Sequence, residues 1–330
     1  MALDLRKAGG GRILRLAEIE AVLMHRPARR FNAFNDSTSP MSLREIVRHT
    51  ALGRLMVIPF RLGWGLTHSL RHAGRVAKWA FGSKEYYNHT YHLTPLNRDY
   101  LVSFVAVLSG HAEPEIEGYF RELENDAELR ATLERQTLNS RDRHNSDVEP
   151  RYGRRVGWYA LVRATKPRVI VETGVDRGLG TVVLAAAVAR NAKEGCPGVV
   201  YATDIVPDCG HLLTEPYKSH CQILLGDSVE TLKKFAEPVD IFLHDSDHRP
   251  EYEWAEFTAI EPRLHGASIV MSDNSQQSPK MREFAARLGK NYLYFQDQPK
   301  DHWWPGDGIG AAFTPGVKTL FQPASRGMRS

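Results

Sequence analysis

A strand, a glycine-rich turn and a helix follow one another at residues 168–180, which read RVIVETGVDRGLG. The β-branched run 169–171 ends in Glu172, and an apolar stretch typical of a helix follows the turn. The turn contains Gly174, Gly178 and Gly180. Glycines let a ligand approach the backbone closely, and a helix start offers free N–H groups. This segment predicts a ligand site in an α/β fold, although dinucleotide-binding folds use a similar turn.

From Arg168 onward, apolar runs alternate with helical patterns, which predicts a doubly wound, mostly parallel sheet. The expected strands are 168–173, 198–204, 220–227, 238–245, 266–274, 291–297 and 308–315. The last two strands are joined by a loop rather than a helix, which differs from a plain dinucleotide-binding sheet. Ligands of such sheets bind at the carboxyl ends of the strands.

Acidic residues stand at the ends of the first five expected strands. They are Glu172, Asp204, Asp227, Asp245 and Asp273. A single acid at one strand end would be unremarkable. Five of them at the ligand-binding edge predict a site for hydroxyl groups, amines and a cation.

The motifs ETGxxxGxG, TD, GDS, DSDH and SDN occur in this order and resemble class I S-adenosylmethionine-dependent methyltransferases over roughly residues 150–315. The resemblance is closest to the metal-dependent O-methyltransferases, which include catechol- and caffeoyl-CoA-type enzymes and methyltransferases of antibiotic sugars. It implies a Rossmann-like, seven-stranded, mostly parallel sheet of order 3-2-1-4-5-7-6 with helices on both faces. A mainly α-helical N-terminal extension would precede this sheet.

The resemblance also implies which residues bind S-adenosylmethionine. Glu172 and the turn with Gly174, Gly178 and Gly180 would hold the amino-acid part of the cofactor. Asp204 would accept hydrogen bonds from both ribose hydroxyls. Asp227 and Ser228 would lie beside the adenine.

A magnesium site is implied in the same way, by Asp245, Asp273 and Asn274. The two aspartates are 28 residues apart, which matches the metal ligands of the catechol-type enzymes. Magnesium prefers such hard oxygen donors and keeps positions open for water or substrate. A substrate hydroxyl bound there becomes more acidic, so its oxygen can attack a methyl group.

His248 lies three residues beyond Asp245, where the catechol-type enzymes place a lysine base. A histidine suits this role, because its unperturbed pKa of about 6.5 is close to working pH. Asp245 and His248 are therefore the expected catalytic residues. Other interpretations stay open: DSDH as a turn with a helix cap, a domain without metal whose Asp245 and Asn274 only position substrate, and a surface histidine. His244 is interpreted as a structural strand residue.

The chain divides by charge as well as by pattern. Residues 1–84 carry 15 Lys and Arg against 5 Asp and Glu, whereas the remainder carries 28 against 34. We expect a basic, mainly helical extension over residues 1–150 and an S-adenosylmethionine-binding domain over residues 151–330. Residues 43–82 combine an apolar face with a basic rim, which suits packing on the domain, a membrane surface, a subunit interface or a substrate lid.

Three further segments carry expectations. A charged amphipathic helix is predicted at 113–136. The segment 86–100 is dense in Tyr, His and Asn, which suits either a ligand wall or a buried polar loop. The loop 296–308, with Trp303 and Trp304, suits either a substrate wall or packing against the extension.

The predicted function is methyl transfer from S-adenosylmethionine to a hydroxyl of a small molecule such as a sugar, a phenol or a secondary metabolite. The alternatives are a metal-independent methyltransferase that acts on a lipid-like acceptor at the membrane surface, and a nicotinamide-dependent oxidoreductase. A binding-only protein is disfavoured by the intact strand-end acids.

A cytoplasmic location is expected from three cysteines without a CxxC pair, a start that lacks a signal peptide, and no long apolar run. Nucleic acid is not expected as a partner, because no RNA-binding module is recognisable. A homo-oligomer stays open.

Overall fold

The computed structural model describes residues 50–85 and 90–320 of the 330-residue chain. Its contacts divide into two compact units, Met1–His72 and Ala73–Ser330. Apart from Thr50, the described part of the first unit belongs to helix α3 (Ala51–Gly82), which continues into the second unit. Residues 43–49 of the predicted amphipathic segment lie outside the described residues, as do residues 86–89 of the Tyr- and His-rich segment.

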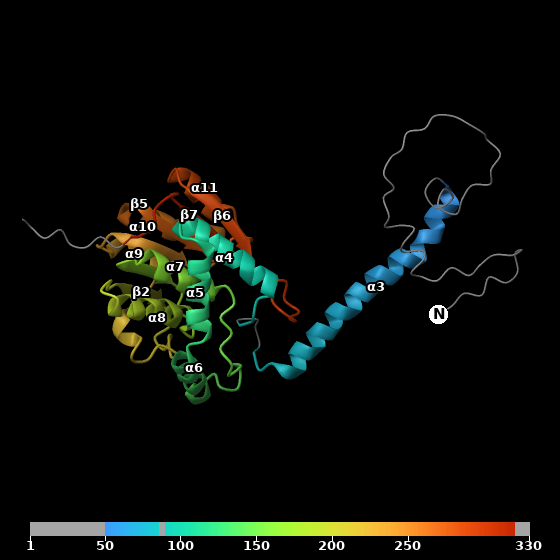
Figure 1. The fold of residues 1–330 in the computed structure, drawn as a ribbon, viewed down its shortest axis with the longest axis horizontal. Coiled ribbons are helices and arrows are strands. Elements are labelled where there is room, and N and C mark those ends of the chain that lie inside the picture. Colours follow the sequence, from blue (N-terminus) through green and yellow to red (C-terminus); the bar gives the residue numbers. More distant parts are fainter. Residues whose placement is uncertain (1–49, 86–89, 321–330) are drawn as a thin grey trace, which may run out of the picture. The chain divides into compact units, whose positions relative to one another are not determined.

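Seven strands form one sheet in the order β3-β2-β1-β4-β5-β7-β6 (Figure 1). Strands β1 to β5 are parallel, and β7 runs antiparallel to both β5 and β6. The strands are β1 (Val169–Thr173), β2 (Val199–Asp204), β3 (Cys221–Leu225), β4 (Val239–His244), β5 (Leu264–Ser272), β6 (Asn291–Gln296) and β7 (Gly308–Phe313). The predicted fold class is confirmed, including the strand order.

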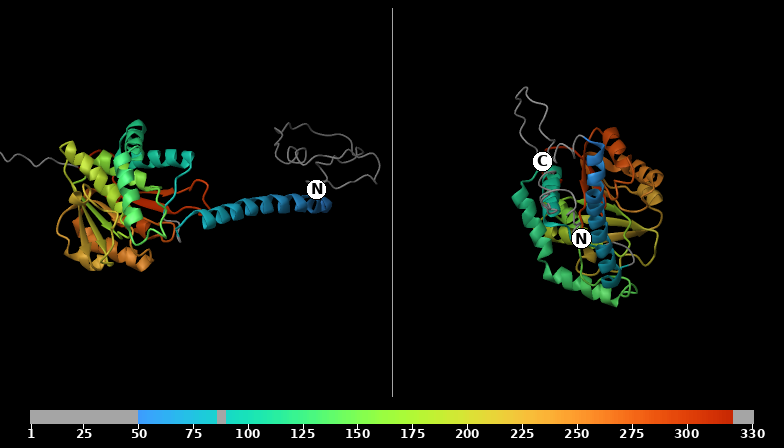
Figure 2. Two further views of the ribbon diagram at one scale, coloured as in Figure 1. Left: turned by 90° about the horizontal axis from the view of Figure 1, so that it is seen from below. Right: turned by 90° about the vertical axis from the view of Figure 1, so that its right-hand side faces the viewer.

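Helices cover both faces of the sheet (Figure 2). One face carries α7 (Arg155–Thr165) and α8 (Leu179–Lys193), and the other carries α9 (Ser228–Lys234), α10 (Pro250–Ile260) and α11 (Lys280–Arg287). Successive side chains of a strand point to opposite faces. Accordingly, Ile170 packs in one apolar cluster while Val169 and Val171 pack in the other. Burial on both faces explains why β1 reads as a continuous apolar run.

Helices α4 (Pro95–Ser109), α5 (Glu113–Glu124) and α6 (Ala127–Asn139) join the apolar cluster formed by α7 and α8. Phe120 of α5 and Leu133 of α6 are fully buried there together with Tyr159 of α7. These helices, which precede residue 150, thus share the core of the sheet domain. The predicted difference in role between residues 1–150 and 151–330 stays a prediction. No helix within residues 50–85 and 90–320 combines the length and hydropathy that a membrane span needs.

The single helix predicted at 113–136 is wrong, because the structure has two helices there. The first ends at Glu124, and the Asp126 side chain accepts a hydrogen bond of 2.9 Å from the N–H of Leu129. An aspartate in this position caps a new helix by satisfying a free N–H group. The amphipathic pattern continues across the break, so periodicity alone concealed it.

Gly174 shapes the turn that follows β1. Its φ is 86°, a conformation that L side chains rarely adopt. A Cβ atom at this position would lie 2.0 Å from the carbonyl oxygen of Asp245, just beyond β4. The glycine turn and the end of β4 therefore touch through their backbones.

We expect Gly174→Ala to lower the free energy of unfolding by at least about 2 kcal/mol, since it adds both backbone strain and a clash. Urea unfolding measures this difference. The matched control is Gly118→Ala on α5, where a Cβ meets nothing within 4 Å. That change should be neutral or stabilise by up to about 1 kcal/mol. Equal effects of the two substitutions would contradict the assignment.

Candidate active site

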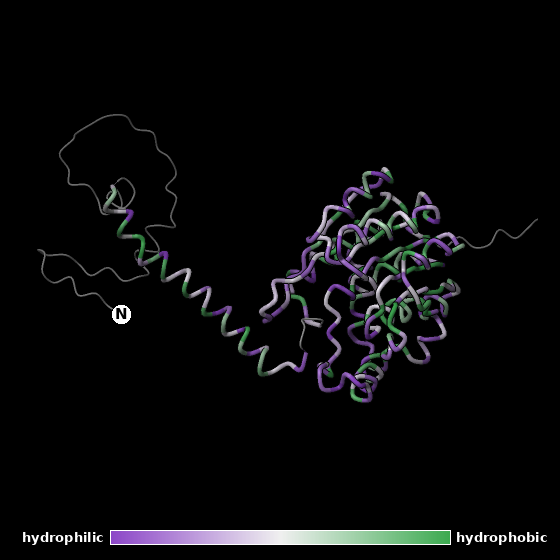
Figure 3. The backbone as a smooth tube through the Cα atoms, turned by 180° about the vertical axis from the view of Figure 1, so that it is seen from behind, coloured by the Kyte–Doolittle hydropathy of each residue, from purple (hydrophilic) through white to green (hydrophobic). Residues whose placement is uncertain are grey.

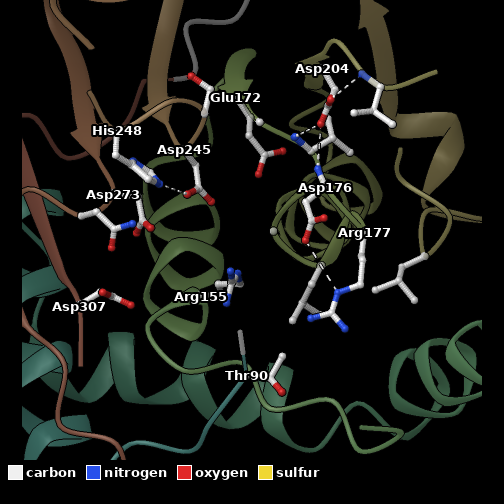
Figure 4. Close-up of a pocket in the computed structure, with 18 of the residues that line it drawn as sticks. Thr90, Arg155, Glu172, Asp176, Arg177, Asp204, Asp245, His248, Asp273 and Asp307 are labelled. Carbon is white, nitrogen blue, oxygen red and sulfur yellow. Dashed lines mark hydrogen bonds and ion pairs between the residues drawn. The ribbon is translucent and has the colours of Figure 1, made fainter. Parts of the chain in front are cut away.

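A cavity of about 920 Å³ lies at the carboxyl ends of β1 to β5 (Figure 4). All of the predicted site residues except Gly178 line it: Glu172, Gly174, Gly180, Asp204, Asp227, Ser228, Asp245, His248, Asp273 and Asn274. Gly178, with φ 93°, caps the start of α8 instead. Asp204 lies toward one end of the cavity, Asp245, His248 and Asp273 lie at the other, and Glu172 lies between.

Asp204 fixes the glycine turn. Its Oδ2 atom accepts hydrogen bonds from the N–H groups of Val175 and Asp176, at 3.0 and 2.9 Å. Its Oδ1 atom accepts one from the N–H of Val206 at 2.8 Å. A carboxylate has about four lone-pair sites, so Asp204 can still accept a hydroxyl group of a ligand.

Glu172 is buried at the end of β1 and accepts a 2.6 Å hydrogen bond from the Thr181 hydroxyl. Burial raises the pKa of Glu172 to about 7. Gly180 packs so closely that an added Cβ would lie 2.6 Å from the Oε1 atom of Glu172. Glu172 is therefore a partly neutral hydrogen-bonding group near pH 7.

Asp227 and Ser228 lie at the start of α9, and both form side-chain hydrogen bonds. Asp227 accepts a hydrogen bond of 3.0 Å from the N–H of Glu230 and another of 3.0 Å from the Tyr252 hydroxyl. Ser228 donates to the buried carboxylate of Glu256. Both residues line the cavity while they hold the start of α9 in place.

Glu256 of α10 was not predicted, yet it organises the floor of the site. Its fully buried carboxylate accepts hydrogen bonds from Thr173 at 2.7 Å and from Ser246 at 2.6 Å. The Nδ1 atom of His244 lies 2.6 Å from it. These contacts tie the ends of β1 and β4 to α10, so the backbone on both sides of Asp245 is fixed.

Asp245, His248 and Asp273 form a compact cluster, in which one ligand atom from each lies within 4.8 Å of the others. The Nε2 atom of His248 is 3.9 Å from the Oδ1 atom of Asp245. Burial, together with the nearby charge of Asp273, raises the pKa of Asp245 well above its usual value. Burial lowers the pKa of His248, so its imidazole is neutral near pH 7.

Arg154 is the main residue that the sequence analysis missed. Its Nε and Nη2 atoms donate to the two carboxylate oxygens of Asp273, each at 2.5 Å. Its Nη1 atom donates to Asp297 at 2.7 Å and to the Tyr91 hydroxyl at 3.0 Å. Burial alone would raise the pKa of Asp273, but the guanidinium of Arg154 holds it below its usual value.

One feature of the sequence does indicate such a partner. Arg154 and Arg155 stand at the start of α7, where the helix dipole disfavours positive charge. Two arginines in that position suggest acidic groups nearby. Pattern alone does not say which acids they are.

The cluster fits a divalent cation of magnesium type. The Oδ1 atom of Asn274 is buried and has no hydrogen-bond partner within the described ranges, as expected for an oxygen that awaits a ligand. Together with Asp245 and Asp273 it makes a set of hard oxygen donors. Arg154 occupies one lone pair on each oxygen of Asp273, and a bound cation would replace the hydrogen bond that Asp273 shares with Asp245.

The loop before β7 provides one wall of the cavity. Trp304 lines it, and the Trp304 indole N–H donates to Asp307 at 3.2 Å. The neighbouring Trp303 packs against Trp79 near the end of α3, with ring centroids 5.3 Å apart. The loop therefore lines the cavity and also packs against α3, and its contact with a substrate stays a prediction.

Residues 171–275 match the family described as "Methyltransferase domain". This part of the chain is a methyltransferase domain. Its strand order is the one expected above from the resemblance to class I, S-adenosylmethionine-dependent methyltransferases. The match disfavours the nicotinamide-dependent alternative.

Comparison with solved structures shows resemblance at low identity. An O-methyltransferase from Bacillus cereus in complex with SAH is 17% identical, covers 60% of this chain and 96% of its own, and has a TM-score of 0.42. The O-methyltransferase TomG from Streptomyces achromogenes, in complex with SAM, is 17% identical, covers 60% of this chain and 95% of its own, and has a TM-score of 0.42. An rRNA methylase from Streptococcus thermophilus is 12% identical, covers 48% of this chain and 94% of its own, and has a TM-score of 0.34. These likenesses do not identify the acceptor, and no curated protein matches the chain significantly.

The raised pKa of Glu172 in the methyltransferase domain makes stability depend on pH. Between pH 4.5 and about 7 the folded state keeps the Glu172 proton, whereas the unfolded state has lost it. The contribution of this group to stability therefore falls as pH rises through that window. Glu172→Gln, which cannot ionise, should gain up to about 3 kcal/mol relative to the parent between pH 4.5 and 7.5.

Urea unfolding at several pH values measures this difference. Glu251→Gln, at an exposed carboxyl group on α10, is the matched control. A constant difference between Glu172→Gln and the parent across the window would contradict the assignment.

Proposed function

We propose that the protein transfers the methyl group of S-adenosylmethionine to a hydroxyl group of a small molecule, with His248 as general base. One observation carries this proposal: a single cavity contains both the glycine turn and the cluster around His248. A methyl donor held at the turn and an acceptor held at the cluster would share that cavity. When bound, S-adenosylmethionine supplies an electrophilic methyl group.

The end of the cavity near the glycine turn would hold the donor. Gly174, Gly178 and Gly180 carry no side chains, so that the amino-acid part can approach the backbone of the turn near Glu172. Asp204 would accept a ribose hydroxyl with the lone pair that its three backbone hydrogen bonds leave free. Asp227 and Ser228 would lie beside the adenine.

At the other end, His248 would accept the acceptor's proton at Nε2, the nitrogen on the side of Asp245. Its lowered pKa keeps the imidazole neutral and able to accept that proton. The charge of Asp273 would stabilise the imidazolium that forms. Gln277, Trp304 and Asp307 surround this end with polar and aromatic groups, which suits a small polar acceptor.

Asp245, Asp273 and Asn274 would hold magnesium beside His248. Bound magnesium would make a coordinated hydroxyl more acidic. Arg154 supports this site because it keeps Asp273 ionised and fixes the direction of its carboxylate.

We expect His248→Ala to lower kcat by about 10²- to 10⁴-fold, since a positioned base contributes that much to proton transfer. The measurement is transfer of radiolabelled methyl from S-adenosylmethionine to a panel of sugars and phenols. Calorimetry should show unchanged affinity for the demethylated cofactor. The control is His265→Ala, whose ring pairs with Asp240 rather than with the cavity. Undiminished turnover in His248→Ala would remove the base assignment.

We also expect turnover to stop in excess chelator and to return with added magnesium, because an acceptor hydroxyl would lose its cation. Asp245→Asn should abolish both turnover and calorimetric binding of Mg²⁺, while cofactor binding survives. Asp208→Asn, at an exposed surface pair with Arg141, is the matched control. Full activity in chelator would refute the metal assignment without touching the methyl-transfer proposal.

The acceptor, a homo-oligomeric state, the cytoplasmic location and the lack of a nucleic-acid partner stay predictions.

A further inference from the structure

Helix α3 has an unusual charge pattern. It runs for 32 residues without a single acidic residue. Its charged residues are all basic: Arg54, Arg61, Arg71, Arg75 and Lys78. No ion pair between neighbouring turns can offset this charge, so α3 suits an anionic partner.

The apolar residues of α3 form a stripe along its length. They recur at steps of three or four, which places them on one side of a helix. The stripe consists of Leu55, Ile58, Leu62, Leu66, Leu70, Ala73, Ala77 and Phe81. Its large side chains are exposed, with fractions of 59% for Leu62, 70% for Leu70 and 93% for Phe81. Figure 3 shows hydrophobic and hydrophilic residues alternating along the helix.

The basic residues recur on the opposite side. Arg54, Arg61 and His68 follow one another at steps of seven, and Arg71, Arg75 and Lys78 continue the side at steps of three or four. Trp64 also falls on this side, where it packs against Phe60 with ring centroids 5.8 Å apart. One side of the helix is thus apolar, and the other side carries the basic residues together with Val57, Phe60, Trp64 and Trp79.

Such a helix needs a surface to cover its apolar stripe. Pro59 and the glycines at 63, 65 and 74 lie inside it, and each lowers helix stability in water. In water a helix gains most of its stability from packing of an amphipathic face. The helical form of α3 is therefore best stabilised by a partner that buries the stripe.

A second copy of α3 fits this role poorly. Two copies would bring only positive charges together, without opposite charges to set their pairing. A heptad that starts at Leu55 would also place Gly65, Ser69 and His72 in the seam. An anionic lipid surface matches both sides of the helix, because acyl chains bury the stripe and headgroups attract the arginines.

We infer that α3 docks in the plane of an anionic membrane surface, with the Leu62–Leu70 stripe inserted and its basic side toward the headgroups. Trp79, near the end of α3, packs against Trp303, whose neighbour Trp304 lines the cavity. A docked helix would therefore tether the methyltransferase domain at the surface. This inference does not depend on the identity of the methyl acceptor.

The test is co-sedimentation of the full chain with vesicles of phosphatidylcholine alone or with about 30% phosphatidylserine, a fraction that gives a negative surface potential. We expect at least about tenfold tighter binding to the anionic vesicles, weakening as salt screens the charges. Leu62→Glu with Leu66→Glu should reduce binding at least about tenfold, since charged residues do not insert. Arg71→Glu with Arg75→Glu should do the same through repulsion.

The matched control is Val107→Glu with Leu138→Glu, on α4 and α6, where both side chains are 53% exposed. These changes should leave vesicle binding unaltered. Every variant should bind the demethylated cofactor as the parent does, which shows that the domain is folded.

Four results would overturn the inference: no binding to anionic vesicles, equal binding to both vesicle types, α3 variants that bind like the parent, or a control variant that binds as weakly as they do. A dimer that Leu62→Glu with Leu66→Glu dissociates, without vesicle binding, would assign the stripe to a second copy instead. Binding to duplex DNA without vesicle binding would assign the basic side to nucleic acid.

Discussion

The site depends on one buried charge, the guanidinium of Arg154. It is flanked by the carboxylates of Asp273 and Asp297, and the three side chains are almost fully withdrawn from water. A buried charge is tolerated only when it is paired and its hydrogen bonds are made. Arg154 meets this condition with four donated bonds, which join the start of α7, the end of β5, the end of β6 and Tyr91.

The pKa values of the acidic residues in the site depend on that charge. Arg154 lowers the pKa of Asp273 and so favours its ionised form. Burial and the charge of Asp273 then raise the pKa of the neighbouring Asp245. His248 is left neutral by its burial, within reach of both acids. Beneath them, Glu256 holds His244 and Ser246, so the backbone around Asp245 is anchored independently of Arg154. The cluster thus combines a histidine with a lowered pKa, an acid with a raised pKa and an acid with a lowered pKa in one place.

Much of this arrangement could be predicted from the sequence, because it follows from the order of the parallel strands. Glu172 and Asp204 close parallel strands, and parallel strands end at the same edge of a sheet, so their proximity follows from strand order. Arg154 could not be predicted in the same way, since it meets Asp273 across 119 residues of chain. Glu256 was missed for a related reason: it sits inside a helix whose buried side is decided by packing. The break at Asp126 was missed because a cap within a continuing amphipathic pattern leaves little trace.

The most direct test of the role of Arg154 is a double-mutant cycle with Arg154→Gln and Asp273→Asn, followed by urea unfolding. If Arg154 compensates the charge of Asp273, Arg154→Gln alone should cost about 3–5 kcal/mol, because it leaves buried carboxylates without a counter-charge. In the Asp273→Asn background the same change should cost less, with a coupling energy of at least about 1 kcal/mol. Additive effects of the two substitutions would contradict the account and would make Arg154 an ordinary packing residue of α7.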